Sequence, residues 1–102
     1  MDPPVKSTRQ VIEEANRIGV QFLLADLATA LTFLNLADVT QSEDSRERNR
    51  QNALLAYQTV LRLQPKLSPS GEEQAAMNEK LEELKNRLTA VGVLGDADDP
   101  QT

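Results

Sequence analysis

The chain has 102 residues, enough for one domain with a single modest core. It contains no Cys and no His, which excludes disulfides, thiolate chemistry, and the commonest general base and metal ligand. A net charge of −5 disfavours binding to the phosphate backbone of nucleic acids. We therefore expect a protein that is not an enzyme, with no catalytic, cofactor-binding or metal-binding residues.

The two ends of the chain differ in composition from its middle. Residues 1–6 contain Pro3-Pro4 and are expected to form a disordered leader, while the acidic residues 93–102 are expected to form a disordered tail. The polar, acidic opening differs from the basic-then-apolar start of a signal peptide, which favours a cytoplasmic location. Residues 7–92 are left as one helical domain.

The first expected helix covers residues 8–39. Ser7 and Gln10 have the spacing of a capping box, which marks the start of a helix. No uninterrupted apolar stretch exceeds the four residues 22–25, so we expect a buried helix and not a membrane span. Gly19 predicts either a bend or a close packing point. The apolar residues cover much of the circumference, with one row at 4-3 spacing formed by Val20, Leu24, Leu27, Leu31 and Leu34.

Two further helices are expected. The second covers residues 44–64, with Ser42, Asp44 and Ser45 as candidate N-caps, and ends at Pro65. The third begins either at Ser68-Pro69 or at a capping box of Ser70 and Glu73, and ends near Gly92. Its apolar seam contains Met77, Leu81, Leu84, Leu88 and Val91. The predicted fold is an all-α, three-helix antiparallel bundle with a long first helix.

The first and second helices share a residue pattern with a known repeat family. The pattern consists of Ala53, Tyr57, Val60, Leu63 and Pro65, preceded by Phe33, Leu36 and Ala37. Residues 33–65 resemble a single tetratricopeptide-repeat-like helical hairpin, although the third helix lacks the Trp-Leu-Gly pattern that would begin a second repeat. Residues 77–87 are similar to the third helix of a three-helix domain that binds microtubules and trafficking partners. Both resemblances imply a helical scaffold that binds a protein or peptide.

Three charged features permit a functional and a structural interpretation. Arg46, Arg48 and Arg50 could bind an anion, but interleaved acidic residues favour a salt-bridged surface. The carboxylates of the third helix, from Glu72 to Glu83, indicate a solvated face. Asp26, amid apolar residues, is expected to face solvent or pair with a basic residue from another helix; the alternative is an anchor for a partner.

The start of the first helix predicts the site of interaction. In a simple bundle it extends beyond the two shorter helices, so it either folds back at Gly19 or is covered by another chain. The predicted partner-binding residues are Val11, Ile12, Ala15, Ile18 and Phe22. We expect an interaction module that binds a protein or peptide partner in a helical groove, without nucleic acid or membrane. The alternative is a self-associating bundle, such as a homodimer, with no separate ligand.

Overall fold

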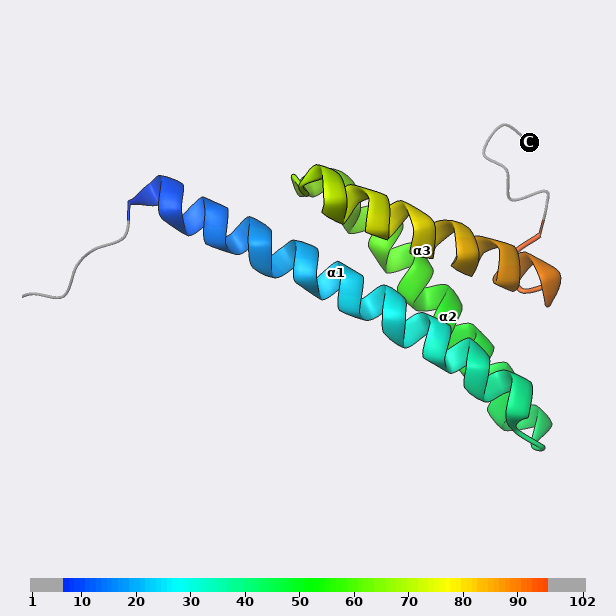
Figure 1. Cartoon of the computed structure of the whole chain (residues 1–102). Coiled ribbons are helices and arrows are strands. Elements are labelled where there is room, and N and C mark those ends of the chain that lie inside the picture. The colour runs from blue at the N-terminus through cyan, green and yellow to red at the C-terminus, as the bar shows by residue number, and fades with distance from the viewer. Residues whose placement is uncertain (1–6, 96–102) are drawn as a thin grey trace, which may run out of the picture.

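The computed structural model describes residues 7–95, and within them it contains helices and no strands. The elements are α1 (Thr8–Val39), α2 (Glu43–Leu63), a short 3-10 helix η1 (Gln64–Lys66) and α3 (Gly71–Ala90). α2 runs back along the second half of α1, and α3 then packs against both (Figure 1). The fold is an all-α three-helix bundle, as the sequence predicts, and it is elongated, with extents of 61 × 33 × 20 Å.

Side-chain caps explain where the helices begin. The Ser7 hydroxyl accepts from the Gln10 N–H at 3.2 Å and the Gln10 side chain accepts from the Ser7 N–H at 2.9 Å, which confirms the predicted box. A second box joins Ser70 and Glu73, with distances of 3.1 and 2.8 Å. The alternative start at Ser68-Pro69 is therefore wrong. α2 starts one residue earlier than expected because Ser42 is its N-cap.

The end of α3 confirms the role of Gly92. This residue has φ of 79°, a left-handed conformation that favours glycine. The Val93 N–H donates to Leu88 O at 3.1 Å and the Gly92 N–H to Thr89 O at 3.0 Å, the two bonds of a Schellman motif. Val93 and Leu94, expected in the tail, instead pack against the core. The expected leader, residues 1–6, and the rest of the tail, residues 96–102, lie outside the described residues.

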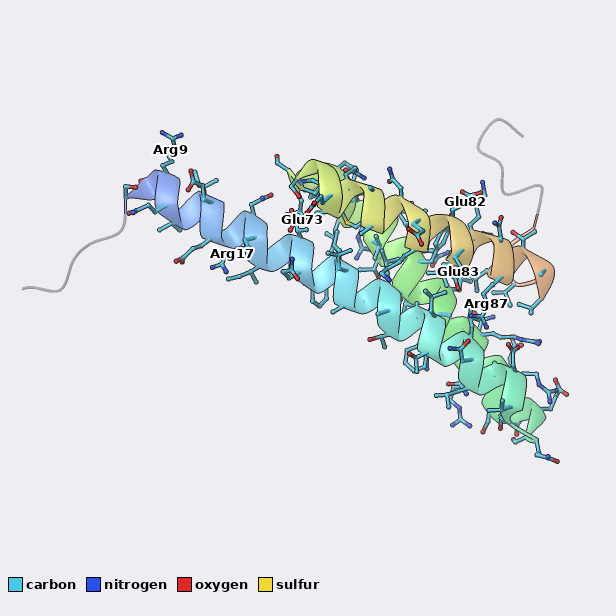
Figure 2. The ribbon with its side chains drawn as sticks, in the orientation of Figure 1. Arg9, Arg17, Glu73, Glu82, Glu83 and Arg87 are labelled. Carbon is cyan, nitrogen blue, oxygen red and sulfur yellow. The ribbon has the colours of Figure 1, made fainter. Side chains whose placement is uncertain are left out.

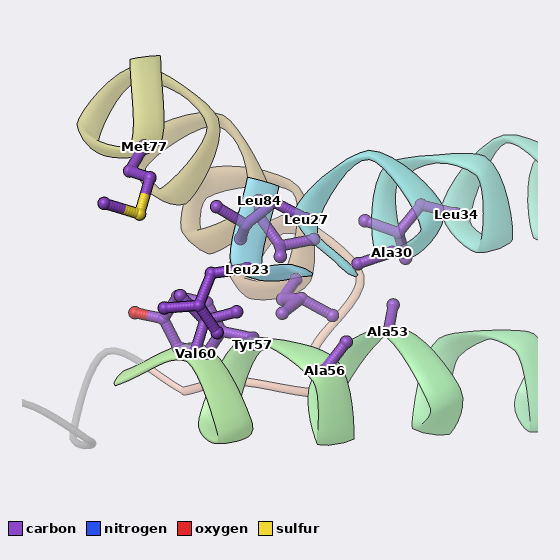
Figure 3. Close-up of a cluster of buried hydrophobic side chains, with 11 residues drawn as sticks. Leu23, Leu27, Ala30, Leu34, Ala53, Ala56, Tyr57, Val60, Met77 and Leu84 are labelled. Atoms are coloured by element: carbon purple, nitrogen blue, oxygen red, sulfur yellow. The ribbon is translucent and has the colours of Figure 1, made fainter. Parts of the chain in front are cut away.

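The core is mostly aliphatic, with Tyr57 and Met77 added, and it lies where the three helices meet (Figure 3). α1 and α2 contact each other through small residues, because Ala30, Ala37 and Ala53 are all buried. Small side chains let helix axes approach closely, and larger residues fill the space toward α3. The fully buried side chains of greatest volume are Leu23, Leu27, Met77, Leu84, Leu88, Val20 and Val60.

The first part of α1 projects beyond the other two helices (Figure 1). We call residues 8–18 the overhang, and none of them is buried; the first buried residue of α1 is Val20. α1 continues through Gly19, so the overhang does not fold back. Gly19 is instead a packing point: a Cβ there would lie 2.8 Å from Cδ2 of Leu67, in the connection between α2 and α3.

Candidate functional site

The predicted partner-binding residues all lie on the surface. Val11, Ile12, Ala15, Ile18 and Phe22 are exposed, and Ile18 is 65% exposed. Single exposed apolar side chains are common, but a contiguous patch of them on one helix is unusual in a monomeric protein. Such a patch is typical of an interaction site. α1 is continuous over this stretch, and within residues 7–95 no other element covers these side chains.

The exposed apolar residues extend well beyond the overhang. Starting at Val11, the residues at alternating steps of four and three along α1 all lie on the outer face, and every one is exposed. We call this row the outer seam: Val11, Ala15, Ile18, Phe22, Ala25, Thr29, Thr32, Leu36 and Val39. Steps of four and three keep a row on one side of a helix, and this spacing is typical of helices that pack against another helix. The sequence-based prediction covered only the first part of this surface.

Two polar contacts hold the base of the overhang in place. The Asn16 side-chain amide donates to Ser68 O at 3.0 Å, and its carbonyl oxygen accepts from the Ser68 N–H at 2.7 Å. One turn further on, the Gln21 side chain donates to Glu73 Oε2 at 3.2 Å. These bonds join residues 52 positions apart, so they fix the direction of α1 relative to the α2–α3 connection.

An open hollow of about 490 Å³ lies beside this junction, between the overhang and the connection that follows α2. Its floor is partly apolar, with Ile12 and Ala15 on one side and Leu67 on the other. Polar groups border it at Glu13, Asn16 and Lys66. The hollow is continuous with the outer seam, because Ile12 and Ala15 belong to the exposed apolar surface of the overhang. It therefore enlarges the exposed apolar surface of the overhang.

The arginine cluster has a structural explanation at its first member. The Arg46 guanidinium donates to Ala37 O at 3.4 Å and Thr40 O at 3.0 Å, at the C-terminal end of α1. It also pairs with Glu43 at 2.7 Å. A cation at this end of a helix complements the partial negative charge of the free carbonyl groups. Arg48 is exposed, and the buried Nε of Arg50 has no hydrogen-bond partner within residues 7–95, so the structural explanation holds for Arg46 alone.

The carboxylates of α3 are dispersed along the helix, as Figure 2 shows for Glu73, Glu82 and Glu83. Within residues 7–95, no group of three or more carboxylates is close enough together to hold a metal ion. Glu73 has a structural role, because hydrogen bonds from the Ser70 backbone and from side chains lower the pKa of its carboxyl group. Arg87, near the end of α3, pairs with Asp38 of α1 at 3.1 Å.

Asp26 is half-buried in the middle of α1, and no hydrogen bond or ion pair holds its carboxylate among the described residues. Partial burial raises the pKa of its carboxyl group above the ordinary value. The folded state therefore binds the proton more tightly than the unfolded state does. Stability is accordingly expected to fall as pH rises through the interval between the two pKa values, and to remain lower above it.

Replacing Asp26 by Asn is expected to raise the free energy of unfolding at neutral pH, by up to about 1 kcal/mol. The gain should vanish in acid, below both pKa values, because the wild-type carboxyl group is then neutral as well. Urea unfolding of both proteins across pH measures the difference. A gain of the same size at every pH would show that the charge of Asp26 is not its cause.

α1 is the one helix within residues 7–95 that is long and apolar enough to cross a membrane. Core helices and signal sequences meet the same criteria, so the observation is weak evidence for a span. In this structure one face of α1 packs in the core, with Leu23, Leu27 and Leu34 in one cluster with residues of α2 and α3, while 33% of its most apolar window is buried. Asp26 also lies near its centre, where a bilayer would make a carboxylate costly.

Comparison of the chain with protein-family models, with curated proteins and with solved structures finds no match. The resemblance of residues 33–65 to a tetratricopeptide-repeat-like hairpin therefore remains a prediction. Ala37, Ala53 and Tyr57, which carry that pattern, are buried, and Ala53 and Tyr57 belong to the cluster to which all three helices contribute. Those positions suit any close pair of antiparallel helices.

Proposed function

We propose that this chain is a non-enzymatic interaction module, and that a protein or peptide partner binds along the outer face of α1. The observation that carries the proposal is the outer seam, a row of exposed apolar and small residues with the spacing of a helix-packing surface. An amphipathic helix that packs into such a row would use the recognition mode in which anchors recur every three or four residues.

The overhang gives this proposal a second support. An isolated helix of about 12–15 residues is only marginally stable in water, and residues 8–18 lack the packing that stabilises the rest of α1. Val11, Ile12 and Ile18 nevertheless make this stretch apolar on its open sides. A partner that covers these residues would stabilise the helix and remove apolar surface from water at the same time.

A protein surface is favoured over a lipid or a nucleic acid by charge. The charged residues that border the outer seam are Glu14 and Asp26, and both are acidic. Helices that lie on anionic membranes instead carry Lys and Arg beside their apolar face. Nucleic acids require a basic surface as well. We accordingly propose a cytoplasmic protein whose partners are other proteins. The dispersed carboxylates and the lack of His and Cys favour a role without catalysis.

The test uses two positions with nearly equal exposure. Ile18 in the outer seam is 65% exposed and Leu55 on α2 is 63% exposed, so a photoreactive amino acid can replace either with similar access to solvent. On irradiation in the source cell, we expect the variant at position 18 to form a discrete cross-linked product that the variant at position 55 does not form. Equal background labelling at both positions would overturn the proposed function.

A further inference from the structure

Building on the proposed function, we infer that the outer seam binds a second copy of this chain, with the two α1 helices antiparallel about a two-fold axis between Leu23 and Leu24. Each copy would present the same surface, as in most homodimers. The inference rests on the sizes and charges of the residues that this arrangement places opposite one another.

Near the two-fold axis the large residues of the outer seam meet small ones in this register, and further along the row residues of similar size meet. Phe22 lies opposite Ala25 of the second copy, and Ile18 lies opposite Thr29. The same two-fold axis places Ala15 opposite Thr32 and Val11 opposite Leu36. Alternation of large and small side chains across an interface lets two helices interdigitate without voids.

The polar members of the outer seam are compatible with burial. The Thr32 hydroxyl already donates to Ala28 O at 3.1 Å, so its methyl group is free to face the second copy without leaving a donor unsatisfied. Thr29 would contact the aliphatic side chain of Ile18 across the axis. Its hydroxyl makes no hydrogen bond within residues 7–95, so burial requires it to turn to the Ala25 carbonyl one turn earlier, as Thr32 does to Ala28.

The borders of the outer seam carry no like charges in opposition. On the two sides of the row the nearest residues are offset from the pairs at the axis by two positions. Glu14 lies nearest Asn35 of the second copy, and Asp26 lies nearest Gly19, which Leu67 of its own chain already contacts. On the same side as Asp26, Ile12 lies opposite Phe33, which extends the apolar contact to the hollow beside the overhang. The antiparallel arrangement also places the positive end of each helix dipole beside the negative end of the other.

A parallel arrangement lacks these advantages. In register, it would place Phe22 against Phe22 and Ala15 against Ala15, so bulky layers alternate with empty ones. Thr29 and Thr32 would each meet their own copy in the interior. In a parallel dimer each residue would meet its own copy, and these pairs fit less well than the pairs of the antiparallel dimer.

The surface has the extent that a weak, specific dimer requires. A standard interface buries roughly 800 Å² on each partner from about 20–30 residues. The 32 residues of α1 span about 48 Å, and the outer seam with its two borders occupies about half of the circumference over that length. We therefore expect reversible association at tens of micromolar rather than a permanent complex.

The absence of natural cysteine makes the register directly testable. The variants Ala15→Cys and Thr32→Cys are purified separately as full chains, one with an affinity tag, and are mixed under mild oxidation by a glutathione buffer. Both positions are exposed, so the substitutions leave the core intact. We expect the mixed disulfide between positions 15 and 32 to exceed either like-with-like dimer at least tenfold, and a Leu55→Cys variant to give only background.

Two results would overturn the inference. Predominant dimers of Ala15→Cys with itself and of Thr32→Cys with itself would show a parallel arrangement, and products no more abundant than those of Leu55→Cys would show no self-association through this face. Neither result would touch the proposed function, which depends on the photochemical experiment at position 18. A cross-link there to a different protein, with the purified chain monomeric, would retain the interaction module and reject the second copy as its partner.

Discussion

Replacing Leu27 by Ala is expected to lower the free energy of unfolding by about 2–5 kcal/mol. Leu27 has no exposed surface and lies in the cluster to which all three helices contribute (Figure 3). Its removal costs the transfer energy of the lost methyl and methylene groups and leaves a cavity that rigid helices cannot fill. A domain of this size has a total stability of about 5–15 kcal/mol, so the loss would be large. Urea unfolding followed by circular dichroism at a fixed protein concentration measures it.

The matched control is Leu55→Ala, which removes the same atoms from a helical site that is 63% exposed. Because those atoms are already largely in water, the change in stability should stay within about 0.5 kcal/mol. Equal losses for Leu27→Ala and Leu55→Ala would contradict the position of the core described for this fold.

Replacing Phe22 by Glu is expected to weaken self-association by about 30-fold or more, since central aromatic residues of an interface commonly contribute 2 kcal/mol or more. Phe22 lies next to the proposed two-fold axis, where the Glu carboxylate would lose water without gaining a partner. The ring is 54% exposed, so the isolated chain should keep its helix content. Size-exclusion chromatography with light scattering over a dilution series measures the effect.

The variant Leu55→Glu provides the control, because it adds the same charge to a similarly exposed leucine on α2. We expect its dimer to dissociate at the same concentration as that of the wild type. Weakening of equal size in both variants would point to net charge, and not to the outer seam, as the cause.

The helices could be predicted from local patterns, but some of their ends could not. The box at Ser7 and Gln10 marked the start of α1 correctly, because both partners are local. At α3 the sequence offered two starts, and the structure selects Ser70 because its box with Glu73 is complete. The backbone N–H of Ser68 is instead bound by Asn16, which lies 52 residues earlier. A contact between residues so far apart in the sequence cannot be predicted from the local spacing of residues.

The candidate site was predicted in part for a related reason. α1 carries apolar residues around much of its circumference, so spacing alone does not reveal which row faces the core. The row containing Leu27 and Leu34 is buried, whereas Phe22 and Leu36 remain exposed, because α2 and α3 pack on one side of the helix. The overhang was recognised from helix lengths. The rest of the outer seam became apparent only with the other two helices in place.

The arginine cluster illustrates the opposite case, in which a conspicuous local pattern has a mainly structural meaning. Arg46 caps the end of α1, and its partners Ala37 and Thr40 contribute only backbone oxygens. No side-chain pattern identifies such acceptors. The less conspicuous alternation of large and small residues along α1 carries the stronger functional implication.

Sedimentation equilibrium of the purified wild-type chain, over concentrations from below one to several hundred micromolar, tests the central claim most directly. The antiparallel pairing of two outer seams predicts a reversible change in mass, from the 11.3 kDa of one chain to twice that value, with a midpoint at roughly tens of micromolar. A single species of 11.3 kDa at every concentration would contradict it.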